Sequence, residues 1–522
     1  MNAHGTPPPQ RFNFAHDILE RNGERGGKPA YIDDDGTLLY GELDLRVRAA
    51  ASAFVALGLR REERVLLCLH DSVDFPVAFL GALYAGIVPV AVNTLLTADD
   101  YAYLLTHSRA QALLVSGALL PVMQQALSRG GNEVKHVIVS RAGRALPERA
   151  QDFAKWWQAA GAMARPADTA ADEAAFWLYS SGSTGHPKGT VHTHGNLHWT
   201  AELYGRPVLG LGENDIVFSA AKLFFAYGLG NALTFPLAAG ATTILMAERA
   251  TPQAVFRRLV EHKPTIFCGV PTLYAAMLSS PELPARDDVA LRRCISAGEA
   301  LPREVGERFA ARFGCEILDG IGSTEMLHIF LSNAPGEVRY GTTGRPVPGY
   351  DVELRGEDGW PVDVDAIGDL YIRGPSAAVM YWADGERTRA TFQGEWTKSG
   401  DKYSRGTDGY YTYAGRSDDM LRVSGQYVSP FEVEAALMRH EMVLEAAVVG
   451  KTGDDGLTRT LAYVVLKSGQ SGDATLAQAL QAFVKDQLAP HKYPREIRFL
   501  PELPKTATGK IQRFKLREGA AG

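Results

Sequence analysis

Residues 179–189 read YSSGSTGHPKG, a run of hydroxylated residues and glycines that follows the apolar residues 176–178. Glycines let a backbone approach an anion closely, and hydroxyls together with free N–H groups can surround phosphate oxygens. The run predicts a phosphate-binding loop at the end of a strand, and a flexible surface loop is the alternative. Its candidate ligands are Ser180, Ser181, Gly182, Ser183, Thr184, Gly185 and the positively charged Lys188.

Two other kinds of glycine-rich loop do not fit this run. A Walker loop has Gly directly before its Lys, whereas Pro187 precedes Lys188. A nucleophile elbow has Gly two positions before its Ser, whereas Ser181 stands there before Ser183. The run therefore predicts neither a P-loop nucleotide hydrolase nor an α/β-hydrolase.

Further polar segments follow the loop in a fixed order. They are SAGEA at 296–300, DGIGSTE at 319–325, SGD at 399–401, GRSDD at 415–419 and PKTATGKI at 504–511. Together with the loop, they resemble the motifs of the adenylate-forming superfamily, which contains acyl-CoA synthetases, luciferases and nonribosomal adenylation domains. The resemblance extends along almost the whole chain.

The resemblance implies how ATP is bound. It implies that Thr324 contacts phosphate and that Glu325 holds Mg²⁺. It also implies that Asp401 binds both ribose hydroxyls and that Arg416 binds a phosphate, although Asp401 taken alone would be interpreted as a turn-capping residue. The remaining implied ATP contacts are Ala297, Gly298, Glu299, Asp319 and Gly320.

The chemistry of such an enzyme explains why these residue types are needed. A carboxylate is a poor electrophile because its leaving group would be oxide, and joining it to AMP replaces that leaving group by a phosphate monoester. Attack on the α-phosphate builds negative charge, which Mg²⁺ on Glu325 and the ammonium of Lys510 can neutralise. The resemblance makes Lys510, Thr324 and Glu325 the catalytic residues.

A second step would transfer the acyl group to CoA. The resemblance places a hinge at Asp418, about which a small C-terminal domain rotates and withdraws Lys510. The rotation would bring Arg422, Ser424 and Gly425 to the acyl adenylate, where the absence of a side chain at Gly425 lets the pantetheine arm pass. An exposed acidic turn is the alternative for Asp418.

The resemblance implies an acyl pocket lined by two segments, 224–230 and 326–329. Aromatic faces separated by Ala and Gly suit a flat, compact ring. One of Phe224 and Phe225 is expected in the core. His328 is expected to edge the ring, to hydrogen-bond a carboxylate or ring hydroxyl, or to be a core histidine with its own partner. The candidate substrate contacts are Phe225, Ala226, Tyr227, Gly228, Gly322, His328 and Ile329.

The phrases FFAYGLGN, CGVPTLYAAML and ILDGIGSTEMLHIF are most similar to aryl-CoA ligases. This similarity implies an AMP-forming acid–thiol ligase that converts ATP, benzoate and CoA into benzoyl-CoA, AMP and diphosphate. A hydroxy- or halo-benzoate is an alternative acid. A stand-alone adenylation domain that loads a carrier protein is another alternative, but the chain ends eleven residues after Ile511, which favours free CoA.

The elements that must position these residues follow an alternating pattern. Apolar strand patterns alternate with helical patterns through about the first 300 residues, which predicts an α/β fold of doubly wound sheets. Closely spaced turn residues at 341–413 predict a small antiparallel β region, and a small α+β domain follows. The expected domains are an AMP-binding domain at 1–417 and a mobile domain at 418–522 that carries the catalytic lysine. The helices expected most clearly are 77–85 and 97–108, the latter opened by a Thr97-x-x-Asp100 capping box.

Composition excludes several classes of protein. The net charge of −6 lacks the positive field of a nucleic-acid binder, and none of the four cysteines forms a CxxC pair. The first residues lack the pattern of a signal peptide, and Gly86 and Pro89 interrupt the uncharged run 75–92. We therefore expect a cytoplasmic monomer or homodimer without a membrane or nucleic-acid partner. The spacing His192-x-His194-x3-His198 lacks a nearby carboxylate or cysteine, so zinc is not expected there.

Overall fold

The computed structural model describes residues 5–143, 146–180, 186–417, 420–423, 426–452, 458–467, 470–488, 492–505 and 511–519. The chain divides into two compact units. The first comprises residues 1–352 and 372–398, and the second comprises 353–371 and 399–522. The expected boundary at residue 418 remains a prediction. No helix among the described residues is long and apolar enough to cross a membrane.

An eight-stranded sheet in the first unit carries the end of the predicted phosphate loop. Its strand order is β19-β9-β8-β4-β3-β5-β6-β7. The strands from β8 to β7 are parallel, whereas β8 and β9 pair antiparallel and so do β9 and β19. The bounds are β3 Arg64–Cys68, β4 Val88–Ala91, β5 Ala112–Ser116, β6 His136–Ser140, β7 Ala150–Asp152, β8 Ala174–Ser180, β9 Lys188–Thr193 and β19 Met380–Tyr381.

A nine-stranded sheet, also in the first unit, has the order β16-β15-β14-β13-β12-β10-β11-β1-β2. Its middle strands are parallel, and the pairs β14–β15 and β15–β16 are antiparallel. The bounds are β1 Pro29–Asp33, β2 Gly36–Leu39, β10 Ile216–Ser219, β11 Thr242–Ile244, β12 Ile266–Gly269, β13 Arg293–Ser296, β14 Ile317–Gly322, β15 Ile329–Ser332 and β16 Arg345–Pro346.

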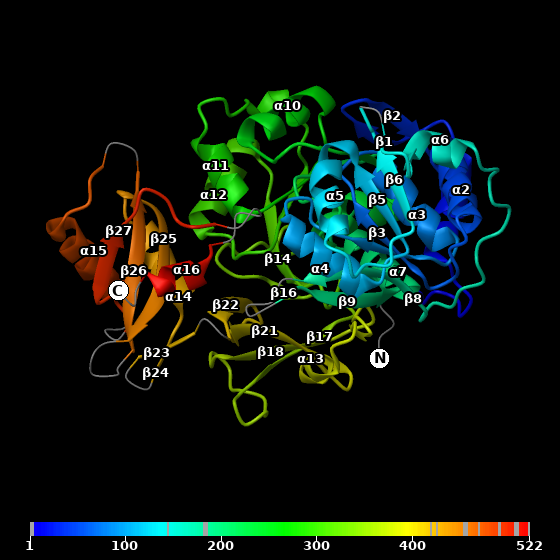
Figure 1. The fold of residues 1–522 in the computed structure, drawn as a ribbon. Coiled ribbons are helices and arrows are strands. Elements are labelled where there is room, and N and C mark those ends of the chain that lie inside the picture. Colours follow the sequence, from blue (N-terminus) through cyan, green and yellow to red (C-terminus); the bar gives the residue numbers. More distant parts are fainter. Residues whose placement is uncertain are drawn as a thin grey trace. The chain divides into compact units, whose positions relative to one another are not determined.

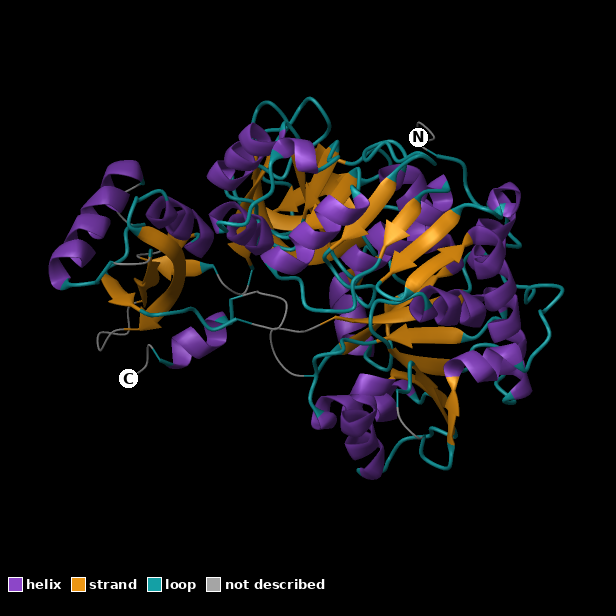
Figure 2. Ribbon diagram, turned by 90° about the horizontal axis from the view of Figure 1, so that it is seen from above, coloured by secondary structure: helices purple, strands orange, loops and turns teal. Residues whose placement is uncertain are grey.

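Helices lie on both sides of these sheets (Figure 1, Figure 2). The doubly wound α/β arrangement predicted from the alternating pattern is therefore confirmed. Their bounds are α1 Phe14–Arg21, α2 Tyr40–Ala56, α3 Asp74–Tyr84, α4 Ala98–Ser108, α5 Leu120–Ser128, α6 Phe153–Gln158, α7 His194–Thr200, α8 Ala226–Leu229, α9 Phe235–Ala239, α10 Pro252–His262, α11 Pro271–Ser279, α12 Arg303–Phe313 and α13 Gly385–Thr391. The shorter helical segments are η1 Gly23–Arg25, η2 Gly117–Leu119, η5 Arg286–Asp288 and the π-helices η3 Ala201–Gly205 and η4 Gly230–Thr234.

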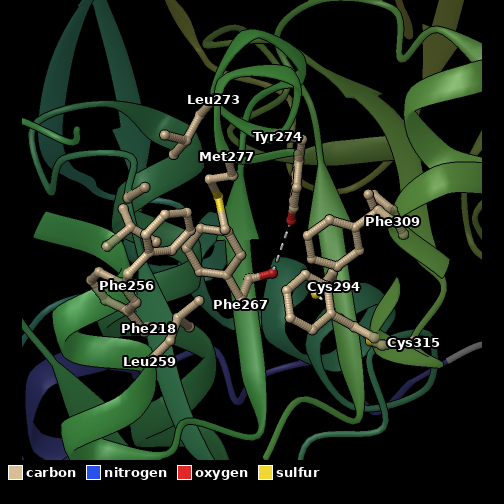
Figure 3. Packing of buried hydrophobic residues seen from close by; sticks show 14 of the residues in the cluster. Phe218, Phe256, Leu259, Phe267, Leu273, Tyr274, Met277, Cys294, Phe309 and Cys315 are labelled. Carbon is tan, nitrogen blue, oxygen red and sulfur yellow. Dashed lines mark hydrogen bonds between the residues drawn. The ribbon is translucent and has the colours of Figure 1, made fainter. Parts of the chain in front are cut away.

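One side of the nine-stranded sheet is covered by a dense aromatic and aliphatic core. Phe218 and Phe267 on the strands pack with Met277 and Phe309 on the helices (Figure 3). The hydroxyl of Tyr274 points back to the sheet and donates to the carbonyl oxygen of Phe267 over 3.4 Å (Figure 3). All four cysteines are buried and free.

The remaining strands belong to smaller sheets. A five-stranded sheet has the order β17-β18-β21-β20, with β22 paired to β21. In the second unit, β23 pairs with β24, and β25-β26-β27 pack against α14 and α15 around a core that includes Val448 and Val464. The bounds are β17 Asp351–Arg355, β18 Gly368–Arg373, β20 Phe392–Gln393, β21 Trp396–Arg405, β22 Tyr411–Arg416, β23 Leu421–Val423, β24 Gln426–Val428, α14 Pro430–Met438, β25 Val443–Thr452, β26 Thr458–Leu466, α15 Ala474–Gln487, β27 Glu496–Phe499 and α16 Arg513–Glu518.

The segment 341–413 differs in part from the expected antiparallel region. It contains helix α13, and its two-residue strand β19 joins the eight-stranded sheet through β9 instead of a local partner. Turn residues predict where strands end but not which distant strand they pair with, because pairing partners are set by long-range packing.

Candidate active site

Ser180, Lys188 and Glu325 come together at the carboxyl end of β8. Ser180 ends β8 and lies opposite Lys188 at the start of β9, while Glu325 follows β14. The Ser180 hydroxyl donates to Oε1 of Glu325 over 3.2 Å, and Nζ of Lys188 lies 3.7 Å from the same oxygen. The lysine and glutamate side chains are 18% and 15% exposed, so they form a half-buried site that solvent or a ligand can still reach.

Tyr381 is part of this site, although sequence reasoning missed it. Its hydroxyl donates to Oε1 of Glu325 over 2.7 Å and accepts from Nζ of Lys188 over 3.1 Å. The ammonium group also lies 4.3 Å from the centroid of the tyrosine ring. Burial, followed by the negative charge of Glu325, raises the pKa of Tyr381 above its ordinary value, so the hydroxyl keeps its proton.

The backbone of Thr324 and Glu325 is held from two sides. Nε2 of the buried His192 donates to the carbonyl oxygen of Thr324 over 2.8 Å. The amide of Ala378 donates to the carbonyl oxygen of Glu325 over 2.7 Å. These contacts fix the direction in which the Glu325 side chain leaves the backbone.

The three histidines that begin near His192 do not converge. His194 accepts from the amide of Phe14 over 3.3 Å, and His198 donates to the carbonyl oxygen of Thr6 over 2.8 Å. Across the described part of the chain, no group of three His, Cys, Asp or Glu side chains is arranged to hold a metal ion by itself.

His328 lies in the region where the acyl pocket is expected. This side chain is 2% exposed and lies against the rings of Tyr204, Tyr227 and Phe235, at centroid distances of 5.4, 5.7 and 4.5 Å. Both π-helices contribute, since Tyr204 belongs to η3 and Phe235 directly follows η4. π-Helical turns often mark functional sites.

Burial makes His328 a neutral side chain. Desolvation lowers its pKa to about 3. Nε2 donates to the carbonyl oxygen of Tyr227 over 3.3 Å, so the ring's proton sits on Nε2 and Nδ1 is an acceptor. This Nδ1 has no hydrogen-bond partner among the described residues. The structure therefore gives a buried histidine with one hydrogen-bonded ring nitrogen, and the two substrate contacts expected from the sequence stay predictions.

Two hydrogen bonds hold the side chain of Tyr227 in place. Its hydroxyl donates to the carbonyl oxygens of Gly269 and Ile295 over 3.1 and 3.2 Å. Phe224 is 5% exposed and belongs to the core, whereas Phe225 is only partly buried, which confirms that one of the pair is a core residue.

Three glycines in the same region leave no space for a side chain. A Cβ on Gly228 would lie 2.0 Å from the carbonyl oxygen of Lys222. A Cβ on Gly322, which pairs with Ile329, would lie 2.5 Å from the carbonyl oxygen of His328. A Cβ on Gly230 would lie 2.3 Å from Cδ2 of His328.

Among the residues expected to contact ATP, Asp319 is buried. Burial raises the pKa of its carboxyl group to about 8, and Oδ2 accepts from the amide of Leu301 over 3.4 Å. Ala297 is buried, and Gly298 has φ +94°, a conformation that favours glycine. Gly320 is enclosed too, since a Cβ there would lie 2.9 Å from Cγ2 of Ile329.

Asp401 and Arg416 lie opposite each other on β21 and β22 in the second unit. The Arg416 guanidinium donates to Oδ1 of Asp401 over 3.3 Å. The carboxylate is mostly buried and the guanidinium is 45% exposed. The two side chains are therefore in contact, and their binding of ribose and phosphate stays a prediction.

Several expected site residues lie outside the described residues. They are Ser181, Gly182, Ser183, Thr184, Gly185, Asp418, Ser424, Gly425 and Lys510. Arg422 lies on β23, where its backbone pairs with that of Tyr427. Glu299 and Ala226 are both partly buried.

The fold and site together define the class of protein. Residues 19–382 match the family described as AMP-binding enzyme, and residues 432–510 match the AMP-binding enzyme C-terminal domain. The chain belongs to this family of adenylate-forming enzymes, and it is an AMP-forming carboxylate–CoA ligase.

The chain is also similar to individual relatives over nearly its full length. The chain is 57% identical to the benzoate–CoA ligase of Thauera aromatica over 98% of each chain. It is similar to the crystal structure of a benzoate CoA ligase from Burkholderia xenovorans LB400, with 63% identity, a TM-score of 0.91, and coverage of 97% of this chain and 100% of that one. It also resembles the anthranilate CoA ligase AuaEII in complex with anthranoyl-AMP, with 39% identity and a TM-score of 0.92 over 98% of each chain.

Proposed function

We propose that this enzyme is a benzoate–CoA ligase. It joins benzoate to AMP with release of diphosphate, and then transfers the benzoyl group to the thiol of CoA with release of AMP. The observation that carries the proposal is the similarity to two benzoate–CoA ligases over nearly the full length, at 57% and 63% identity. The site geometry supports it, because it combines a phosphate-type polar cluster with an apolar aromatic region.

The polar cluster is assigned to the triphosphate of ATP. Ser180, Lys188 and Thr324 would bind phosphate oxygens, together with the hydroxyls and glycines of 181–185. Asp319 and the segment 297–299 would enclose adenine, and Asp401 with Arg416 would bind ribose and phosphate. Lys510 would supply positive charge to the transition state of adenylation.

Glu325 is assigned to Mg²⁺. A carboxylate oxygen is the ligand that Mg²⁺ prefers, and the metal usually binds one or two carboxylates plus substrate phosphates. Ser180 and Tyr381 donate to Oε1 of this side chain, which is also the oxygen closest to Nζ of Lys188, and Oε2 accepts no hydrogen bond from the described residues. The carboxylate therefore fits one metal bond, and the bound ion would neutralise charge on phosphate oxygens.

The benzoate ring is assigned to the region beside the stacked rings of Tyr227 and His328. Both side chains present ring faces, and the half-buried Phe225 with Ala226 and Gly228 borders them. A neutral His328 suits an uncharged ring, because a protonated imidazole would bring an unpaired charge into an apolar pocket. Gly322 and Ile329 complete the proposed lining.

A ring with a hydroxyl or amino substituent is the second candidate. Nδ1 of His328 is a buried acceptor without a partner among the described residues, and a substituent that donates a hydrogen bond would satisfy it. The assignment of Asp418 as hinge and of Arg422, Ser424 and Gly425 to the CoA arm follows from the family and is proposed on that basis.

The test is release of diphosphate from MgATP with a panel of acids, with and without CoA. Benzoate should give the highest kcat/KM, and CoA should be required for turnover beyond one equivalent of adenylate. A higher kcat/KM for a hydroxy- or aminobenzoate would favour the second candidate, and no diphosphate release with any aryl acid would refute both.

A further inference from the structure

The hydroxyl of Tyr381 lies between the two charged side chains of the proposed triphosphate site. Lysine can only donate, so Nζ of Lys188 donates to the tyrosine oxygen over 3.1 Å. The tyrosine in turn gives its own proton to Oε1 of Glu325 over 2.7 Å. The result is a directed chain from ammonium to hydroxyl to carboxylate.

These two hydrogen bonds keep the charges of Lys188 and Glu325 apart. Nζ of Lys188 lies 3.7 Å from Oε1 of Glu325, whereas a direct charge-assisted hydrogen bond would be about 2.7–2.9 Å long. The ammonium also faces the tyrosine ring, with 4.3 Å between Nζ and the ring centroid. The tyrosine therefore acts as a spacer that attracts both groups and prevents them from closing onto each other.

Tyr381 is held in place by its pairing within the eight-stranded sheet. Tyr381 pairs with Thr190 of β9, and the next amide along, that of Trp382, donates to the carbonyl oxygen of Gly189 over 2.7 Å. The amide of Tyr381 itself donates to the hydroxyl of Thr388 over 3.1 Å. The side chain is 2% exposed and its ring lies 5.4 Å from that of Phe392. The hydroxyl therefore has little freedom to leave its place.

We propose that Tyr381 is a positioning residue for the adenylation step, whose hydroxyl keeps Oε2 of Glu325 available to the cation of MgATP and keeps Lys188 available to a phosphate. This inference rests on the proposed function. Without the hydroxyl, Lys188 would close onto Glu325 as a direct ion pair, and both groups would have to separate before MgATP could bind. Tyr381 lies in none of the polar motifs that resemble those of the adenylate-forming enzymes.

The test substitution is Tyr381→Phe, which removes one oxygen and keeps the ring against Lys188 and Phe392. The control is Tyr40→Phe, which also removes a buried tyrosine hydroxyl, in this case one that donates to the carbonyl oxygen of Ala241 over 2.6 Å and contacts no charged side chain of the proposed site. Binding of Mn²⁺ with a non-hydrolysable ATP analogue is measured by electron paramagnetic resonance, so the readout does not need turnover. Tyr381→Phe should weaken Mn²⁺–nucleotide binding about tenfold, the scale of one hydrogen bond to a charged group, and Tyr40→Phe should not.

Steady-state kinetics provide the second readout. The KM for MgATP should rise by a similar factor in Tyr381→Phe, while the KM for benzoate stays within about twofold of the wild type. A purely structural role would change both KM values together. Unchanged Mn²⁺–nucleotide affinity and an unchanged KM for MgATP would overturn the proposal.

A double variant distinguishes a spacer from a packing defect. With Lys188→Met in the background, no ammonium remains to close onto Glu325, so adding Tyr381→Phe should have little further effect on Mn²⁺–nucleotide affinity. An equal loss in both backgrounds would refute the spacer. If the wild type bound Mn²⁺ and nucleotide but released no diphosphate with any acid, the proposed function would fail while the binding comparison still decided the role of Tyr381.

Discussion

Nε2 of His328 donates to the backbone carbonyl oxygen of Tyr227, which lies 101 residues earlier in the chain. The bond joins the two segments that the sequence predicts as walls of the acyl pocket. It also fixes which ring nitrogen carries the proton, and burial lowers the pKa of the ring to about 3. The proposed acyl pocket would therefore contain a histidine that stays neutral throughout the physiological pH range.

His328 should make the protein sensitive to acid. Its folded-state pKa of about 3 lies below the ordinary 6.5, so the unfolded chain binds the proton first and stability is lost as pH falls below 6.5. At pH 5.5 this single site should lower the free energy of unfolding by about 1.4 kcal/mol relative to pH well above 6.5. His328→Gln should lack this contribution.

The measurement is chemical unfolding of the wild type and His328→Gln at pH 7.5 and pH 5.5. Other buried histidines, such as His192 and His194, are present in both proteins and cancel in the difference. The same pH-dependent loss in both proteins would show that His328 is already protonated or exposed.

A side chain at position 230 should collide with the imidazole of His328, so we expect glycine to be required there. A Cβ at this position would lie 2.3 Å from Cδ2 and 2.8 Å from Nε2 of the imidazole. Gly230→Ala should displace the ring and lower kcat/KM for benzoate about tenfold or more, in line with the 1–3 kcal/mol typical of overpacking.

A double-mutant cycle tests this cause. In a His328→Ala background the added methyl group meets only the 3.1 Å approach of Cζ of Phe235, so Gly230→Ala should cost little further. Additive losses would indicate that the alanine acts through the π-helix η4 and not through the imidazole.

Tyr227 should affect the acid more than the nucleotide. Tyr227→Ala removes the ring that faces His328 and the hydroxyl bound to Gly269 and Ile295. The KM for benzoate should rise about tenfold to a hundredfold, because a buried aromatic contact is worth a few kcal/mol, while the KM for ATP changes little. Parallel increases in both constants, measured by diphosphate release, would remove Tyr227 from the pocket.

Lys510 should separate the two half-reactions. Lys510→Ala should reduce benzoyl-adenylate formation strongly, by at least the 10²–10³-fold that is typical for loss of one well-placed charge (about 3–4 kcal/mol). Thioester formation from supplied benzoyl-adenylate and CoA should be retained. Equal impairment of both steps, each assayed in single turnover, would contradict the assignment of this lysine to adenylation alone.

Local sequence patterns predicted much of the fold correctly. The helix expected at 97–108 is α4, and the hydroxyl of its N-cap Thr97 accepts from the amide of Asp100 over 3.3 Å. The uncharged run 75–92 is helix α3 followed by strand β4, because Gly86 adopts a positive φ between them. Such features depend on neighbours in sequence and can be recognised there.

The candidate site was predictable where its residues belong to contiguous motifs. Ser180, Lys188 and Glu325 do belong to them, and the structure brings them together. Tyr381 does not, since it reaches Glu325 only because two residues of β19 pair with β9, whose first residue lies 193 positions earlier. The π-helices around His328 are equally hidden, because they arise from packing and have no propensity signal of their own.

Strand β19 has a consequence for solubility as well as for catalysis. It is the outermost strand of the eight-stranded sheet, and it contains only Met380 and Tyr381 before the chain turns away at Ala383, which has φ +52°. A strand this short offers few unpaired amides to a neighbouring molecule, which is one way that proteins avoid edge-to-edge aggregation. Substitutions that detach β19 would uncover the longer β9, so self-association would accompany any loss of turnover.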